Sequence, residues 1–156
     1  MGGGANVTLA ERLAQDSREA MRAREEGRLR LSVLRLALAA IRNEEIARRR
    51  PLSEEEVQGI LRQQMRQRRD ALHEIEGRGR PEAEERLRAE LDAIATYLPP
   101  ELDAQALEGE VKRAVEELGA MGLRDMGRVM AVLMSRLRGR ADGAAVQAAV
   151  RRVLGA

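Results

Sequence analysis

The sequence predicts an all-helical protein, because its apolar residues recur at helical spacing and its composition disfavours β-sheets. Aromatic residues make up 1% of the 156 residues, and Phe, Trp and Cys are absent. A core of Leu, Ile, Val, Met and Ala favours helices, whereas sheets draw on aromatic and β-branched residues. No alternating apolar run indicates a strand. We therefore expect about seven helices, in an N-terminal helical-hairpin subdomain followed by a small C-terminal three-helix subdomain.

Capping signals define the helices of the first half. Thr8 with Glu11, and Ser53 with Glu56, have the spacing of capping boxes. Pro81 is placed to be the first residue of a helix. The first four helices are expected at about residues 8–26, 28–49, 53–76 and 81–98, with breaks at Gly27, Pro51 and 77–81.

The firmest break in the chain is Leu98-Pro99-Pro100, because two consecutive prolines cannot lie inside a helix. Beyond it, Asp103 can cap a fifth helix and Asp142 a seventh. These last helices are expected at about 103–118, 126–137 and 142–154. The predicted organisation is therefore a disordered tail at 1–7, an N-terminal domain at 8–98 and a C-terminal domain at 99–156.

The sequence contains no complete catalytic constellation. His73 is the single histidine, and we interpret it as a surface or partly packed residue rather than a metal ligand. The many paired carboxylates are adjacent on charged helices, where they usually face water or pair with Arg. No G-x-x-x-x-G-K phosphate loop is present. We expect no catalytic residue, no metal and no cofactor.

Positive charge gathers at the C-terminal end. The whole chain carries +2, but residues 118–156 hold seven arginines against two acids, which gives +5 there and −3 elsewhere. This asymmetry favours a polyanionic partner, with a solvated arginine-rich face as the alternative. Arg62, Arg66 and Arg69 also share one face of the third helix, although nearby acids can neutralise them.

Base stacking is disfavoured, because Tyr97 is the single aromatic residue and is expected to pack where the subdomains join. Contacts of arginine with the phosphate backbone remain available. Met121, Met126, Met130 and Met134 lie on or near the inner face of the sixth helix. We interpret them as core residues, with an adaptable binding groove as the alternative.

No segment has the roughly 20 apolar residues of a membrane span, and the N-terminus does not have the pattern of a signal peptide. A soluble, cytoplasmic protein without membrane contact is therefore expected.

Several ordered motifs resemble those of the bacterial YqeY proteins, and the resemblance extends over nearly the whole chain from about Leu9. They occupy residues 31–35, 41–46, 68–70, 97–99, 125–130 and 139–143. The C-terminal part of that family is similar to the tail of the B subunit of aspartyl/glutamyl-tRNA amidotransferase, where a helical tail contacts tRNA. The catalytic domains of that enzyme have no counterpart in this chain.

The resemblance implies a tRNA-binding or accessory module, with an amidotransferase or an aminoacyl-tRNA synthetase as a further partner. Carbon–nitrogen ligase activity with glutamine as amido-N-donor is ascribed to the family as a whole, but the resemblance does not imply that this chain carries it. A second hypothesis is a component that helps such transamidation, either directly or as an accessory. The alternative is a protein–protein adaptor without nucleic acid. Arg140 has an alternative role, since pairing with Asp142 would fix the loop that contains both residues. The candidate tRNA-backbone contacts are Arg124, Arg128, Arg136, Arg138 and Arg140.

Overall fold

A computed structural model describes residues 6–155, and these residues form seven α-helices and two short 3-10 helices without any strand. The predicted all-helical fold is confirmed. The described residues divide into two compact units, one ending at residue 98 and the other starting at residue 99, each with its own core. Most of the expected tail, residues 1–5, lies outside the described residues. No helix within 6–155 is long and apolar enough to cross a membrane.

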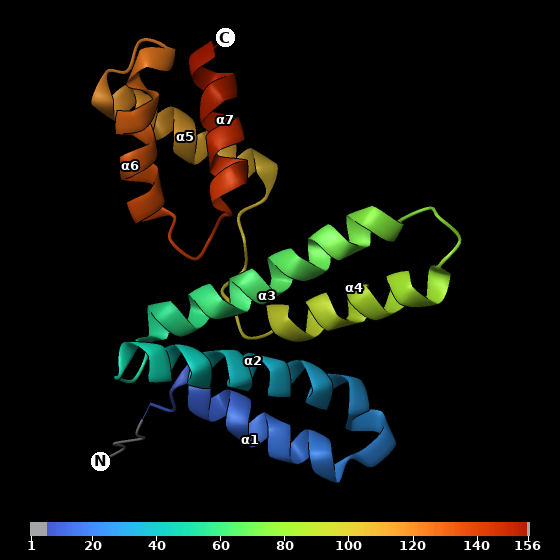
Figure 1. Cartoon of the computed structure of the whole chain (residues 1–156). Helices are drawn as coiled ribbons and strands as arrows, with labels where there is room; N and C mark the ends of the chain where they lie inside the picture. The colour runs from blue at the N-terminus through green and yellow to red at the C-terminus, as the bar shows by residue number, and fades with distance from the viewer. Residues whose placement is uncertain (1–5, 156) are drawn as a thin grey trace. The chain divides into compact units, whose positions relative to one another are not determined.

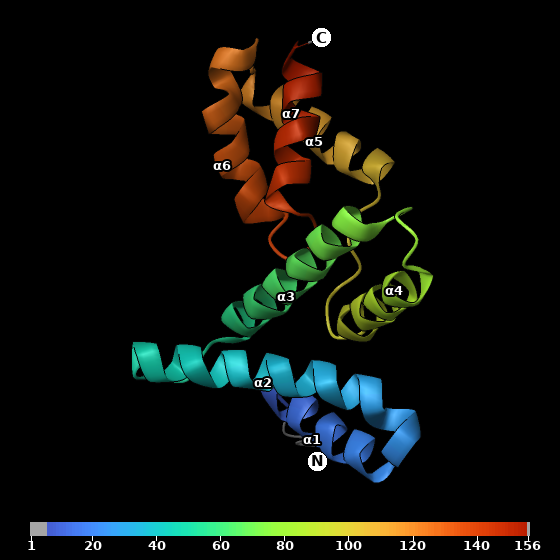
Figure 2. The same ribbon diagram turned by 45° about the vertical axis from the view of Figure 1, so that its right-hand side comes forward.

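The N-terminal unit consists of two helical hairpins (Figures 1 and 2). Its four helices are α1 (Leu9–Arg22), α2 (Arg28–Arg48), α3 (Glu54–Ile75) and α4 (Pro81–Ala95). Helix α1 packs against α2, α3 packs against α4, and α2 also contacts α3 and α4. The buried core draws on all four helices and includes Leu13, Leu34, Ile41, Leu61 and Ile94.

Both predicted capping boxes are formed. The Thr8 hydroxyl accepts from the Glu11 N–H at 3.1 Å, and the Glu11 carboxylate accepts from the Thr8 N–H at 3.3 Å. Ser53 and Glu56 make the same two bonds at 3.2 and 3.0 Å. Pro81 stands in the first turn of α4, as predicted.

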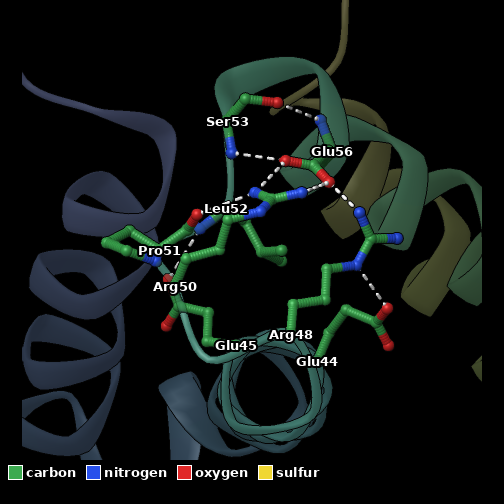
Figure 3. Close-up of polar contacts among 8 residues, drawn as sticks. All are labelled: Glu44, Glu45, Arg48, Arg50, Pro51, Leu52, Ser53 and Glu56. Atoms are coloured by element: carbon green, nitrogen blue, oxygen red, sulfur yellow. Dashed lines mark hydrogen bonds and ion pairs between the residues drawn. The ribbon is translucent and has the colours of Figure 1, made fainter.

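The connection between α2 and α3 adds two arginines to the second box (Figure 3). The Glu56 carboxylate accepts two bonds from Arg50, each 2.9 Å long, and another from Arg48. The hydrogen bond with Arg50, followed by the backbone bond from Ser53, holds the pKa of Glu56 well below its ordinary value of 4.5. The Glu45 carboxylate accepts from the Leu52 N–H at 3.0 Å, so α2 fixes the start of α3 at two points.

The first helix is shorter than predicted. It ends at Arg22 rather than near Glu26, and a 3-10 turn follows at Arg24–Gly27. A Cβ atom at Gly27 would lie 2.1 Å from the carbonyl oxygen of Ala20, so the chain turns back directly over α1. A helix continued to residue 26 would carry Gly27 away from this contact.

Helix α2 buries Val33 and Ala37 on its core side, whereas Leu31 and Leu38 lie only partly buried at its edge. The fourth helix is shorter than the predicted range of 81–98. Helix α4 stops at Ala95, because the next N–H groups bond three residues back in tighter turns.

The C-terminal unit is the predicted three-helix bundle. It contains α5 (Ala104–Leu118), the 3-10 turn η2 (Leu123–Asp125), α6 (Met126–Arg136) and α7 (Gly143–Gly155). Asp103 caps α5 by accepting from the Ala106 N–H at 2.7 Å. The three helices contact one another around a core that includes Val111, Val129, Leu133, Val146 and Val150.

The methionine interpretation is right for two residues and wrong for two. Met126 and Met130 pack against the core of the C-terminal unit. Met121 is 84% exposed, because it lies in the loop after α5 has ended, and Met134 is also exposed on the outer side of α6.

Candidate nucleic-acid interface

Positive charge in the C-terminal unit is concentrated on η2, α6, α7 and their connecting loop. Residues 123–155 hold seven arginines and two acids, a net charge of +5. All seven arginine residues are exposed. Helix α5 has the opposite balance, with four glutamates against one lysine and one arginine. The unit therefore has a cationic part and a weakly acidic helix.

The antiparallel packing of α6 and α7 sorts these arginines to two ends (Figures 1 and 2). The start of α6 lies beside the end of α7, and η2 contacts α7. The α6-start group therefore consists of Arg124, Arg128, Arg151 and Arg152. The α6-end group consists of Arg136, Arg138 and Arg140. The five predicted residues thus fall into two groups, because an 11-residue helix is about 16 Å long.

Within the α6-start group, Arg128 is held by the protein and three arginines are not. The Arg128 guanidinium lies 3.6 Å from the Asp125 carboxylate and donates to the Leu118 carbonyl at 3.3 Å. Asp125 in turn accepts from the Met121 N–H at 2.9 Å. Among residues 6–155, the side chains of Arg124, Arg151 and Arg152 have no hydrogen-bond or ion-pair partner.

Within the α6-end group, two of the three arginine side chains interact with other described residues and one does not. Arg136 is ion-paired with Glu117 of α5, and Arg138 also interacts within the protein. The Arg140 side chain has no hydrogen bond or ion pair to any other described residue, so the alternative pairing with Asp142 is not formed. The Arg140 backbone carbonyl instead accepts from the Leu102 N–H at 2.7 Å, which ties the loop to the segment before α5.

Sequence reasoning counted Arg151 and Arg152 in the charge balance but did not place them in the site. These two arginines join the site because α6 and α7 pack antiparallel, which brings the last turn of α7 beside the start of α6. That relation depends on how two amphipathic helices pack, and linear spacing alone does not give it.

The arginine face predicted on α3 is engaged within the protein. Arg62 donates to the Gln58 side chain at 3.1 Å, and Arg66 and Arg69 also interact within the protein. Arg68 of the same helix is buried and forms a 3.1 Å ion pair with Glu90 of α4. The Arg68–Glu90 ion pair joins α3 to α4, whereas the Arg62–Gln58 bond lies within α3.

Tyr97, which was expected where the subdomains join, is 5% exposed and belongs to the core of the N-terminal unit. Its hydroxyl donates to Asp16 at 2.5 Å and accepts from Arg30 at 3.1 Å, and the Arg12 guanidinium lies 5.3 Å from its ring centre. Burial, followed by the Asp16 hydrogen bond, raises the pKa of Tyr97. The hydrogen bond to Tyr97 raises the pKa of Arg30.

This polar network is suited to packing rather than to chemistry. An open hollow beside it is lined by Arg12, Asp16, Arg30, Asp92 and Thr96, among others. A raised tyrosine pKa favours the neutral phenol, which is a poor base. The hydroxyl therefore joins α1 and α2 to the segment after α4.

The described residues contain no group of three or more His, Asp or Glu side chains arranged to hold a metal ion. His73 is exposed on α3.

Comparison with known proteins places the chain in a family. The model of the Yqey-like proteins matches residues 10–154, which covers both units. No curated protein matches the chain. On the strength of the family match, the chain belongs to the YqeY-like proteins.

Proposed function

We propose that the C-terminal unit binds the phosphate backbone of structured RNA, tRNA in particular, through the arginines of η2, α6, α7 and their connecting loop. The observation that carries the proposal is a net charge of +5 over residues 123–155 in which several exposed arginines lack a partner among the described residues. These arginines are Arg124, Arg140, Arg151 and Arg152.

Arginine is suited to this task, because its planar guanidinium binds phosphate with two parallel hydrogen bonds and stays charged at all physiological pH values. The cationic part of the unit carries no aromatic side chain for base stacking. Contacts of this kind recognise the backbone and shape of an RNA rather than its sequence.

The proposal assigns binding to this chain and chemistry to a partner. In this view the protein acts beside an amidotransferase or an aminoacyl-tRNA synthetase, and carbon–nitrogen ligation with glutamine as donor belongs to that enzyme. The candidate residues support binding, since they are arginines exposed on the surface of the C-terminal unit.

The experiment compares binding of fluorescently labelled bulk tRNA to the full-length protein and to three triple Arg→Gln variants. One variant changes Arg124, Arg151 and Arg152 of the α6-start group. The second changes all three residues of the α6-end group. The matched control removes three exposed arginines of the N-terminal unit, Arg18, Arg22 and Arg78.

The α6-start variant is expected to weaken binding at least tenfold and to reduce the slope of log K against log salt by about two to three. The α6-end variant should lose less affinity for tRNA, because Arg136 and Arg138 already interact within the protein. The control should change affinity less than twofold. Equal losses in all three variants would contradict the assigned site, and unchanged affinity in all three would contradict arginine binding.

A further inference from the structure

Helix α2 has a second apolar face that the fold leaves uncovered. Leu36 is 54% exposed and Ile46 is 68% exposed, although both lie on a helix whose opposite side is buried in the core. Ala39 and Asn43 lie between them and are also exposed. We call these four residues the α2 stripe. Their spacing of three, four and three is that of a seam between two packed helices.

A row of arginines follows one flank of the α2 stripe. Arg28, Arg35 and Arg42 are exposed and recur every seven residues, a rise of about 10 Å per step along one side of the helix. Arg28 has an exposed contact with Glu25 at 3.7 Å. Arg35 and Arg42 have no hydrogen-bond or ion-pair partner among residues 6–155.

The nearest acids on α2 do not neutralise this row. Glu44 pairs with Arg48, and Glu45 accepts from the Leu52 N–H (Figure 3). Both carboxylates are therefore committed to the connection between α2 and α3. The arginine row presents positive charge beside the apolar stripe.

A hollow lies at the N-terminal end of the stripe. It is lined by Glu25, Arg28, Leu29, Ser32 and Arg86. Ser32 stands one turn before Leu36, so the hollow continues the stripe and could receive one apolar side chain against Leu29. Two arginines and one glutamate make its rim predominantly positive.

We propose that the α2 stripe docks an acidic amphipathic helix of a partner protein. Such a helix would place an apolar seam on Leu36, Ala39 and Ile46 and carboxylates opposite the arginine row. The inference concerns the N-terminal unit and goes beyond RNA binding by the C-terminal unit.

Charge and chemistry favour this occupant over two others. A second copy of the chain would bring the same arginine-flanked stripe, without a free carboxylate row on α2 to match it. An RNA backbone would satisfy the arginines but would leave Leu36 and Ile46 facing phosphate and ribose. An acidic helix satisfies both features together.

The test uses a synthetic three-heptad peptide with leucines along its seam and glutamates on both flanks. A second peptide carries lysine in place of every glutamate. Binding to the isotope-labelled full-length protein is followed by fluorescence anisotropy and by amide chemical shifts. We expect micromolar binding of the glutamate peptide with shifts confined to α2 and its neighbours, and at least tenfold weaker binding of the lysine peptide.

Three double variants locate the contact. Arg35→Glu with Arg42→Glu should weaken the glutamate peptide at least tenfold and strengthen the lysine peptide. Leu36→Ser with Ile46→Ser should weaken both peptides. The control, Arg18→Glu with Arg22→Glu on the exposed surface of α1, should leave binding within twofold of the wild type, and circular dichroism should show that all variants remain helical.

Several outcomes would overturn the proposal. They are no binding of the glutamate peptide at about millimolar concentration to a folded protein, amide shifts away from α2, or equal affinity for both peptides. Sedimentation that shows a dimer disrupted by Leu36→Ser with Ile46→Ser would assign the stripe to a second copy. Amide shifts in α2 caused by bulk tRNA, and lost in Arg35→Glu with Arg42→Glu, would assign the arginine row to RNA.

Discussion

The buried Tyr97 hydroxyl is hydrogen-bonded to two side chains that lie far from it in the chain. The position of Tyr97 beside two prolines suggested a place where the two subdomains join, but the chain instead folds it into the N-terminal core. The decisive partners, Asp16 and Arg30, lie 81 and 67 residues away in sequence. No local pattern marks such distant residues as a pair.

The ionisation of Tyr97 provides a residue-level prediction. Its pKa is raised above 10.0, so the folded state favours the neutral phenol. The corresponding stability is present below the pKa of the unfolded chain and is lost as pH rises through 10 toward the folded value. The chain has one tyrosine and no tryptophan, so ultraviolet absorbance titration reports this group alone.

The titration midpoint should lie above 10 in the folded protein and at the ordinary value in denaturant. Asp16→Asn, which removes the charge that opposes ionisation, should move the folded midpoint down. A wild-type midpoint equal to that of the denatured chain would refute the buried, hydrogen-bonded environment of the hydroxyl.

At the scale of the element, the sequence predicted where helices begin better than where they end. Capping boxes are local, so Thr8 and Ser53 could be identified directly. The end of α1 depends on the close approach of Gly27 to Ala20, which exists only when α2 packs back on α1. Gly27 therefore marks a contact between elements as well as a break between them.

Two glycine substitutions test this interpretation. Gly27→Ala would place a methyl group against the Ala20 backbone, and we expect it to lower the free energy of unfolding by about 3 kcal/mol. Gly59→Ala is the matched control, because Gly59 is an exposed residue of α3 and nothing lies within 4 Å of the added Cβ. It should raise stability by about 1 kcal/mol. Denaturant unfolding measures both, and similar effects of the two changes would contradict the close packing at Gly27.

The connection between α2 and α3 gives a prediction about pH. The pKa of Glu56 is lowered from 4.5, so its charged form stabilises the fold above pH 4.5 and this contribution is lost as pH falls toward the folded value. Glu56→Gln keeps a side chain that can accept the Ser53 N–H bond but removes the charge that binds Arg48 and Arg50.

Wild type should therefore be more stable than Glu56→Gln at neutral pH, and the difference should shrink as pH is lowered below 4.5. The measurement is the free energy of unfolding of both proteins across that range. A difference that is independent of pH would show that the charge of Glu56 plays no part.

At the scale of the whole molecule, composition and periodicity were sufficient for the all-helical fold, while the candidate site depended on topology. Leu107, Val111 and Val129 could be predicted as core residues from their spacing. The grouping of Arg124 with Arg151 could not, because it requires the antiparallel arrangement of α6 and α7. Which arginines remain without protein partners also depends on acids of other helices, such as Glu117 for Arg136.

The two units are proposed to carry separate binding surfaces. The C-terminal unit presents arginines suited to RNA phosphates, and the N-terminal unit presents the α2 stripe suited to a protein helix. A protein with both surfaces could bring a tRNA and a partner protein together without catalysing a reaction itself. Loss of one surface should leave the other binding activity intact.

The most direct measurement is the affinity of the full-length protein for bulk tRNA across a salt series, followed by fluorescence anisotropy. We expect micromolar or tighter binding at low salt. The slope of log K against log salt should be about −3 or steeper, because four arginines have no partner in the described structure and each contributes about 0.7 to 0.9 to the slope. Absence of binding at low salt by the folded protein, or an affinity that does not change with salt, would contradict the proposed RNA-binding function.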